Sequence, residues 1–98
     1  MTPEELEERL AKAIRRHRER LMHSQEGFSD SIGLNRTYYG KIERHQQNPA
    51  IKNLQKIANG LGVPLSQLIS EAEAMDEQGV REPPMPPRRG RPPGRRSY

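Results

Sequence analysis

Two short helical segments joined by a tight turn, at residues 25–44, constrain the fold of this chain more than any other feature. In the first segment, Phe28 and Ile32 are four residues apart and therefore share one helical face. Gly33 supplies the left-handed backbone conformation that a tight turn requires. Asn35 is a favourable N-cap for the second segment. The pattern predicts two helices that pack against each other across the turn.

The second of these helices, predicted from residue 36 to about residue 44, has an inner and an outer face. The spacing from Leu34 and Ile42 places Tyr39 on the inner face, which leaves the adjacent Tyr38 on the outer face. A face of basic and hydrogen-bonding side chains is favourable only where it contacts water or phosphate. Such a face therefore indicates a polyanionic partner such as double-stranded DNA. The residues predicted on that face are Arg36, Thr37, Tyr38, Lys41 and Arg44.

A longer helix is predicted before this pair. Thr2 and Glu5 form a capping-box pattern, and Pro3 fits the first helical position. Apolar residues then recur at helical spacing to the end of the helix, so that one face of this helix is predicted to be buried. The residues predicted on that face are Leu6, Leu10, Ile14, His17 and Leu21.

Two more helices are predicted after the pair. Asn48 and Pro49 are typical of a helix start, and Gly62 is typical of a helix end in the left-handed conformation. Pro64 then begins a fifth helix. No alternating apolar pattern is long enough for a strand, so the predicted fold is all-α with five helices. The predicted inner faces consist of Ile51, Leu54, Ala58 and Leu61 in the fourth helix and Leu65, Leu68, Ile69 and Ala72 in the fifth.

The composition changes near Gly79, which predicts a folded domain at residues 1–78 and a separate tail at residues 79–98. From residue 81 onwards the chain has six arginines and one glutamate, a net charge of +5, and almost nothing apolar to bury. Residues 1–80 carry eleven basic and twelve acidic groups, a net charge of −1. The proline- and arginine-rich tail is therefore expected to be disordered when it is alone.

The tail contains a short pattern similar to the core of an AT-hook. In such a segment, glycine lets the backbone approach the floor of the minor groove, and the arginines enter the negative potential of that groove. A nonspecific basic arm explains the same residues and is the simpler interpretation. The proline-rich part of the tail also matches a peptide-ligand pattern. The residues of the candidate minor-groove segment are Arg88, Arg89, Gly90, Arg91 and Pro92.

The composition argues against several other classes of protein. The chain has no cysteine, which excludes disulfides and thiolate metal sites. It has no signal-peptide pattern and no apolar run approaching the roughly 20 residues of a membrane helix, so we expect a soluble cytoplasmic, nucleoid-associated protein. His17, His23 and His45 lack metal-ligand spacing, and no phosphate loop or nucleophile–base set occurs. The sequence therefore predicts no cofactor, no metal site and no enzymatic activity.

Residues from about Leu10 to Ile69 resemble the phage-repressor and Cro-like (XRE-type) helix-turn-helix family. LNRTYYGKIER and the later NPAIKNLQKIANGLGVPLSQLI are most similar to controller proteins of restriction–modification systems and to small autoregulators. The resemblance implies a lambda-repressor-like domain that binds a palindromic operator as a dimer, with its third helix in the major groove. The positions that match the family pattern are Gln25, Phe28, Ser29, Gly33, Leu34, Asn35, Tyr39, Ile42 and Glu43.

The resemblance also implies roles for individual residues. Arg36, Thr37 and Tyr38 correspond to positions that contact base edges or the adjoining backbone, and the planar fork of arginine matches guanine. Arg18 corresponds to an arginine that pairs with the residue at position 43, which implies an Arg18–Glu43 bridge. The remaining positions implied to lie at the DNA, mostly as phosphate contacts, are Gln25, Asn35, Lys41, Arg44 and Asn48.

The chain departs from the family pattern at two helix ends. His45 replaces the glycine that often ends the third helix, which predicts a different loop after that helix. Met22 and His23 replace a glycine–apolar pair before the second helix, which predicts that His23 is less buried than its counterpart.

The predicted function is that of a sequence-specific DNA-binding transcriptional regulator. A homodimer is predicted to form through Leu65, Leu68 and Ile69 of the fifth helix, although these residues can instead close the core of the monomer. One alternative is the antitoxin of a toxin–antitoxin pair, whose main partner is a toxin protein. Another alternative is an adaptor that binds proteins and uses its proline-rich tail as a ligand.

Overall fold

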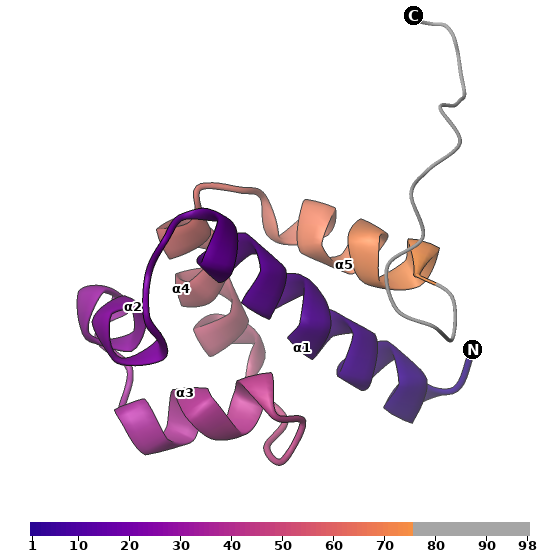
Figure 1. The fold of residues 1–98 in the computed structure, drawn as a ribbon. Helices are drawn as coiled ribbons and strands as arrows, with labels where there is room; N and C mark the ends of the chain where they lie inside the picture. Colours follow the sequence, from indigo (N-terminus) through magenta and orange to yellow (C-terminus); the bar gives the residue numbers. More distant parts are fainter. Residues whose placement is uncertain (76–98) are drawn as a thin grey trace, which may run out of the picture.

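The computed structural model describes residues 1–75, which form five helices and no strand (Figure 1). The predicted all-α fold with five helices is therefore confirmed. The predicted boundary between residues 78 and 79 lies outside the described residues, as do the tail residues Arg88, Arg89, Gly90, Arg91 and Pro92. The helices are α1 (Pro3–Arg20), α2 (Gln25–Ile32), α3 (Arg36–Glu43), α4 (Ile51–Leu61) and α5 (Leu65–Ala74).

Helix α1 is the central element of the bundle. It packs against α5 on one side and against α3 on the other, and it also contacts α4 (Figure 1). Helices α2 and α3, which the tight turn joins, contact each other. Both also contact the rest of the bundle, α2 through α4 and α3 through α1. The predicted capping box at the start of α1 is present, with Thr2 Oγ1 accepting from the amide of Glu5 at 3.1 Å.

All five helices contribute to one hydrophobic core. The rings of Phe28 in α2 and Tyr39 in α3 lie 5.4 Å apart between centroids in a tilted arrangement, which is favourable for an aromatic pair. Ser29 is fully buried, and its hydroxyl donates to the carbonyl oxygen of Glu26 at 3.0 Å. The largest fully buried apolar side chains are Tyr39, Phe28, Ile14, Ile42, Ile57 and Leu68.

The start of α4 differs from the prediction. The helix begins at Ile51 rather than at Pro49, and Ala50 is its N-cap residue, with a carbonyl that accepts from the amide of Leu54 at 3.0 Å. Ile51 is 70 % exposed, whereas Ile57 is fully buried. A helical side chain covers the turn that precedes it, and Ile51 has no preceding helical turn to cover. The prediction of an inward Ile51 was therefore wrong.

The end of α1 also differs from the prediction. Leu21 is the C-cap residue of α1 and is 45 % exposed, so it does not belong to the buried face. His17 is buried as predicted, and its Nε2 lies 2.8 Å from Oε1 of Glu71, which joins α1 to α5. His23 is exposed, which agrees with the expectation that it is less buried than its counterpart in the family.

Four helix ends share one backbone motif. Gly33 (φ 76°) and Gly62 (φ 78°) directly follow α2 and α4 in a left-handed conformation. Met22 (φ 66°) and His45 (φ 58°) adopt the same conformation one residue further on, after the C-cap residues of α1 and α3. The amide of Met22 donates to the carbonyl of Glu19 at 2.9 Å, which is one of the two hydrogen bonds of a Schellman motif. After α3, His45 adopts the left-handed conformation that favours glycine, and a loop that differs from that of the family stays a prediction.

Within residues 1–75, none of the helices is both long enough and apolar enough to cross a membrane. This part of the chain also has no group of three histidine, cysteine, aspartate or glutamate side chains placed to hold a metal ion.

Candidate nucleic-acid interface

Helix α3 is held in place by its first turn and by its inner face. The side chain of Asn35 accepts from the amide of Tyr38 at 3.0 Å, so Asn35 is the N-cap residue that the sequence predicts. Tyr39 and Ile42 are buried in the core, as expected from their spacing. The opposite side of α3 is consequently turned away from the bundle.

A buried ion pair braces α3 against α1. Nε of Arg18 donates to Oε2 of Glu43 at 2.7 Å, and Nη2 donates to Oε1 at 3.0 Å. The implied Arg18–Glu43 bridge is thus confirmed, in the bidentate form that gives arginine–carboxylate pairs their fixed geometry. Nη1 of Arg18 also donates to the carbonyl oxygen of His23 at 2.6 Å, which ties the chain before α2 to the same group.

Glu43 accepts two further hydrogen bonds, from the side-chain nitrogen Nε2 of Gln25 at 3.0 Å and from the hydroxyl of Tyr39. Burial alone would raise the pKa of Glu43, but the hydrogen bonds from Arg18, Tyr39 and Gln25 lower it below its usual value. Burial and the Glu43 carboxylate raise the pKa of Tyr39, so the phenol stays protonated and continues to donate. The four side chains form one network that links α1, α2 and α3.

Gln25 occupies part of its hydrogen-bonding capacity inside this network. One hydrogen of its amide nitrogen is directed at Glu43, and the side chain is half-buried at the first position of α2. The other amide hydrogen is not used by Glu43. A phosphate contact by Gln25 stays a prediction, and the geometry adds a structural role that the sequence did not indicate.

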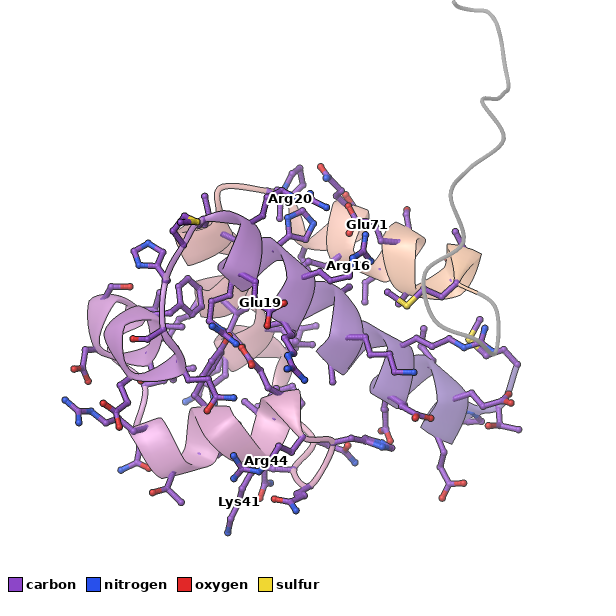
Figure 2. All side chains as sticks on the ribbon, viewed as in Figure 1. Arg16, Glu19, Arg20, Lys41, Arg44 and Glu71 are labelled. Carbon is purple, nitrogen blue, oxygen red and sulfur yellow. The ribbon has the colours of Figure 1, made fainter. Side chains whose placement is uncertain are left out.

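The side of α3 that faces away from the bundle carries four exposed residues. Figure 2 shows Lys41 on this side of α3, with Arg44 at the same end of the helix. Arg16 and Arg20 lie across α1, near Glu71 of α5, and do not belong to this surface (Figure 2). We refer to the exposed set as the outer face of α3; it consists of Arg36, Thr37, Lys41 and Arg44.

Tyr38 does not belong fully to this outer face. It is half-buried and packs against the core, and its hydroxyl accepts a hydrogen bond from Nδ2 of Asn53 in α4 at 3.0 Å. The interpretation that Tyr38 faces outward was therefore only partly right. The signal was present in the sequence, because Tyr38 is four residues from both Leu34 and Ile42 and so lies on the same helical stripe.

Asn48 lies apart from the outer face of α3. It is exposed in the loop between α3 and α4, and this loop forms one wall of an open groove. The other wall is the start of α1, where Glu4 and Glu8 are among the lining residues. Carboxylates repel phosphate, so the surroundings of Asn48 are less favourable for DNA than the outer face of α3.

Arg36 makes contacts that the sequence did not predict. Its Nε donates to Oδ1 of Asp30 at 3.2 Å and its Nη2 donates to Oδ2 at 2.9 Å, while Nη1 lies 3.6 Å from Oε1 of Glu26. The hydrogen bonds with Arg36 lower the pKa of Asp30, and the same hydrogen bonds raise the pKa of Arg36. No helical periodicity relates residues 30 and 36, because the turn at Gly33 separates them.

Comparisons with known proteins agree with this arrangement. A family model described as helix-turn-helix matches residues 14–68, the segment from α1 to α5. Control protein C.MunI of a Mycoplasma species is 50 % identical over 50 residues, which are 51 % of this chain and 68 % of that protein. Control protein C.SmaI of Serratia marcescens is 32 % identical over 75 residues, which are 76 % of this chain and 89 % of that protein. The crystal structure of the hypothetical transcription factor NHTF from Neisseria superposes with a TM-score of 0.64 at 38 % identity and covers 66 % of this chain and 73 % of that chain.

Proposed function

The chain belongs to the XRE-type helix-turn-helix family, and from this premise we propose that it is a sequence-specific DNA-binding transcriptional regulator. One observation carries the proposal: the outer face of α3 is exposed and basic, while the inner face of the same helix is fixed by the core and by the Arg18–Glu43 pair. A helix that is fixed in this way and has an exposed basic face suits the major groove of B-DNA, which admits an α-helix.

The residues of α3 divide between two kinds of contact. Arg36 is the first residue of the helix, where a recognition helix enters the groove, and its guanidinium matches the two major-groove acceptors of guanine. Thr37 follows it and contacts a base edge or the adjoining backbone. Lys41 and Arg44 lie at the other end of α3 and neutralise phosphates, which contributes affinity without sequence preference.

We further propose that the regulator binds a palindromic operator as a homodimer. A two-fold dimer places two copies of α3 about one helical turn of DNA apart, which requires an operator of matching symmetry. Leu68 is fully buried within the monomer and so offers no surface to a partner, which corrects its predicted role. Leu65 and Ile69 of α5 are only half-buried, and they are the residues that we assign to the dimer surface.

The experiment that tests this function is an in vitro selection of random duplex DNA with the full-length protein at roughly 0.15 M salt. We expect an enriched palindrome with a wild-type protein, and loss of the preferred guanine in each half-site with Arg36→Ala. Arg20→Ala is the matched control, because Arg20 is exposed on α1 away from α3 and its loss removes the same charge (Figure 2).

The other outcomes of the selection distinguish the remaining functions. Enrichment of AT-rich DNA without symmetry would indicate that the tail, and not α3, is the main DNA-binding segment. No enrichment of any sequence would contradict the proposal and favour a protein-binding role, as in an antitoxin or an adaptor.

A further inference from the structure

The guanidinium of Arg36 is held by an acidic side chain of the neighbouring helix. Asp30 of α2 accepts hydrogen bonds from Nε at 3.2 Å and from Nη2 at 2.9 Å, so both of its carboxylate oxygens are engaged. Glu26, one turn earlier on α2, lies 3.6 Å from Nη1 and makes an ion pair without a hydrogen bond. Arg36 is 58 % exposed in its side chain, yet its head group has a defined position.

Asp30 leaves the end edge of the guanidinium without a hydrogen bond, although Glu26 lies 3.6 Å from Nη1 at this edge. Arginine has five N–H donors in a planar fork, and Asp30 uses one on Nε and one on Nη2. The second hydrogen of Nη2 and the hydrogens of Nη1 form the end of the fork. This end edge supplies two parallel donors, which is the arrangement that guanine O6 and N7 accept in the major groove.

The helix that carries Asp30 is anchored in the core. The residues Phe28 and Ser29 next to it on α2 are buried in the core, and the backbone carbonyl of Asp30 accepts from the amide of Gly33 at 3.2 Å in the turn. Asp30 therefore projects from a braced helix and not from a loop. A side chain held by a rigid neighbour loses less conformational entropy when it binds.

We propose that Asp30 is a positioning residue that fixes the end edge of Arg36 for a bidentate contact with one guanine in each half-site. This inference rests on the proposed DNA-binding function and extends it to a residue outside α3. Asp30 acts through Arg36 and does not itself contact a base.

The same geometry gives Asp30 a second effect on selectivity. An arginine with a free head group can bind a phosphate at any sequence, whereas an arginine held by Asp30 is directed away from that alternative. The carboxylates of Asp30 and Glu26 also repel phosphates next to the groove. Loss of Asp30 is thus expected to weaken binding to the preferred site and to strengthen binding to unrelated DNA.

The test measures dissociation constants of the full-length protein for the selected operator and for the same duplex with the guanine of each half-site replaced. The discrimination ratio is the dissociation constant for the duplex with replaced guanines divided by that for the operator. We expect Asp30→Ala to reduce this ratio by about tenfold or more, which is the discrimination of a good bidentate pair. Glu26→Ala is the matched control, since it removes the same charge near Arg36 but no hydrogen bond, and we expect it to leave the ratio within about twofold.

A double-mutant cycle with Arg36→Ala distinguishes an effect of Asp30 that acts through Arg36 from an effect of Asp30 on the DNA itself. In the Arg36→Ala background, Asp30→Ala is expected to leave the ratio unchanged, because no guanidinium remains to be positioned. Equal effects of Asp30→Ala and Glu26→Ala would overturn the inference in favour of simple charge. Tighter operator binding by Asp30→Ala with an unchanged ratio would also overturn it, because Asp30 would then only sequester Arg36.

These outcomes differ from a failure of the proposed function. If the wild-type protein selects no sequence, the function fails and the inference fails with it. If Arg36→Ala loses the guanine preference while Asp30→Ala keeps it, the function stands and only the inference is overturned.

Discussion

Arg18 and Glu43 form a buried bidentate ion pair that joins α1 to α3, with Nε–Oε2 and Nη2–Oε1 distances of 2.7 and 3.0 Å. The pair lies directly behind the helix that we assign to DNA, so it fixes the position of α3 relative to the bundle. Its contribution is structural, because neither side chain reaches the outer face of α3.

Removal of one partner should be costly. Arg18→Met leaves the Glu43 carboxylate buried with only Tyr39 and Gln25 as donors, and we expect the free energy of unfolding at pH 7 to fall by about 3 kcal/mol. Urea denaturation checks this value. Arg15→Met is the control, because Arg15 pairs with Glu19 on an exposed surface, and it should change stability by less than about 0.5 kcal/mol. Unchanged stability of Arg18→Met would show that the bridge contributes nothing.

The same network predicts how stability depends on pH. The pKa of Glu43 is lower in the folded protein than its usual value of 4.5, so the folded state favours the charged carboxylate. This stabilisation is present above pH 4.5 and is lost as the pH falls through the folded pKa. In Arg18→Met the burial of Glu43 is no longer offset by arginine, so the difference in stability between variant and wild type should shrink on acidification.

Urea midpoints of both proteins between neutral pH and acid check this dependence. A difference that stays constant across that range would contradict the assignment of the pH effect to Glu43.

Two helix ends offer stabilising substitutions. Met22 and His45 adopt the left-handed conformation, with φ of 66° and 58°, which costs an L-residue about 1 kcal/mol relative to glycine. We expect Met22→Gly and His45→Gly each to raise the free energy of unfolding by about 0.5–1 kcal/mol, measured by thermal or urea unfolding. Lys12→Gly, at an exposed site within α1, should instead lower it by about 1 kcal/mol.

Self-association through α5 is directly measurable. We expect a dimer in sedimentation equilibrium at tens of micromolar protein, and a shift toward monomer when Leu65 and Ile69 are both replaced by lysine. Cooperative unfolding of the variant would show that its fold persists. A wild-type monomer that also binds the operator without dimerising would contradict the assigned surface.

Local signals in the sequence were sufficient to predict most of the fold. Capping residues such as Thr2 and Asn35, and glycines such as Gly33, act on their own helix ends, so their positions along the chain predict the boundaries. The start of α4 was misplaced because Asn48 and Pro49 resemble a helix start, although the chain enters its first helical turn at Ile51.

The candidate site was less predictable than the fold. The Arg18–Glu43 pair followed from the family resemblance, and the structure bears it out. The hydrogen bonds from Arg36 to Asp30 and from Asn53 to Tyr38 join residues on different helices, and their formation depends on the angle between those helices. Periodicity describes one helix at a time and carries no information about that angle.

The most direct test of the central claim is a residue-resolved NMR titration of the ¹⁵N-labelled full-length protein with the selected duplex. We predict that the largest amide shifts occur at residues 35–44, with smaller shifts in α2 where it approaches the DNA backbone. No shifts are expected along the side of α1 that carries Arg16 and Arg20 (Figure 2). Shifts confined to α5, or to residues beyond Met75, with α3 unchanged would contradict the assignment of α3 to the DNA.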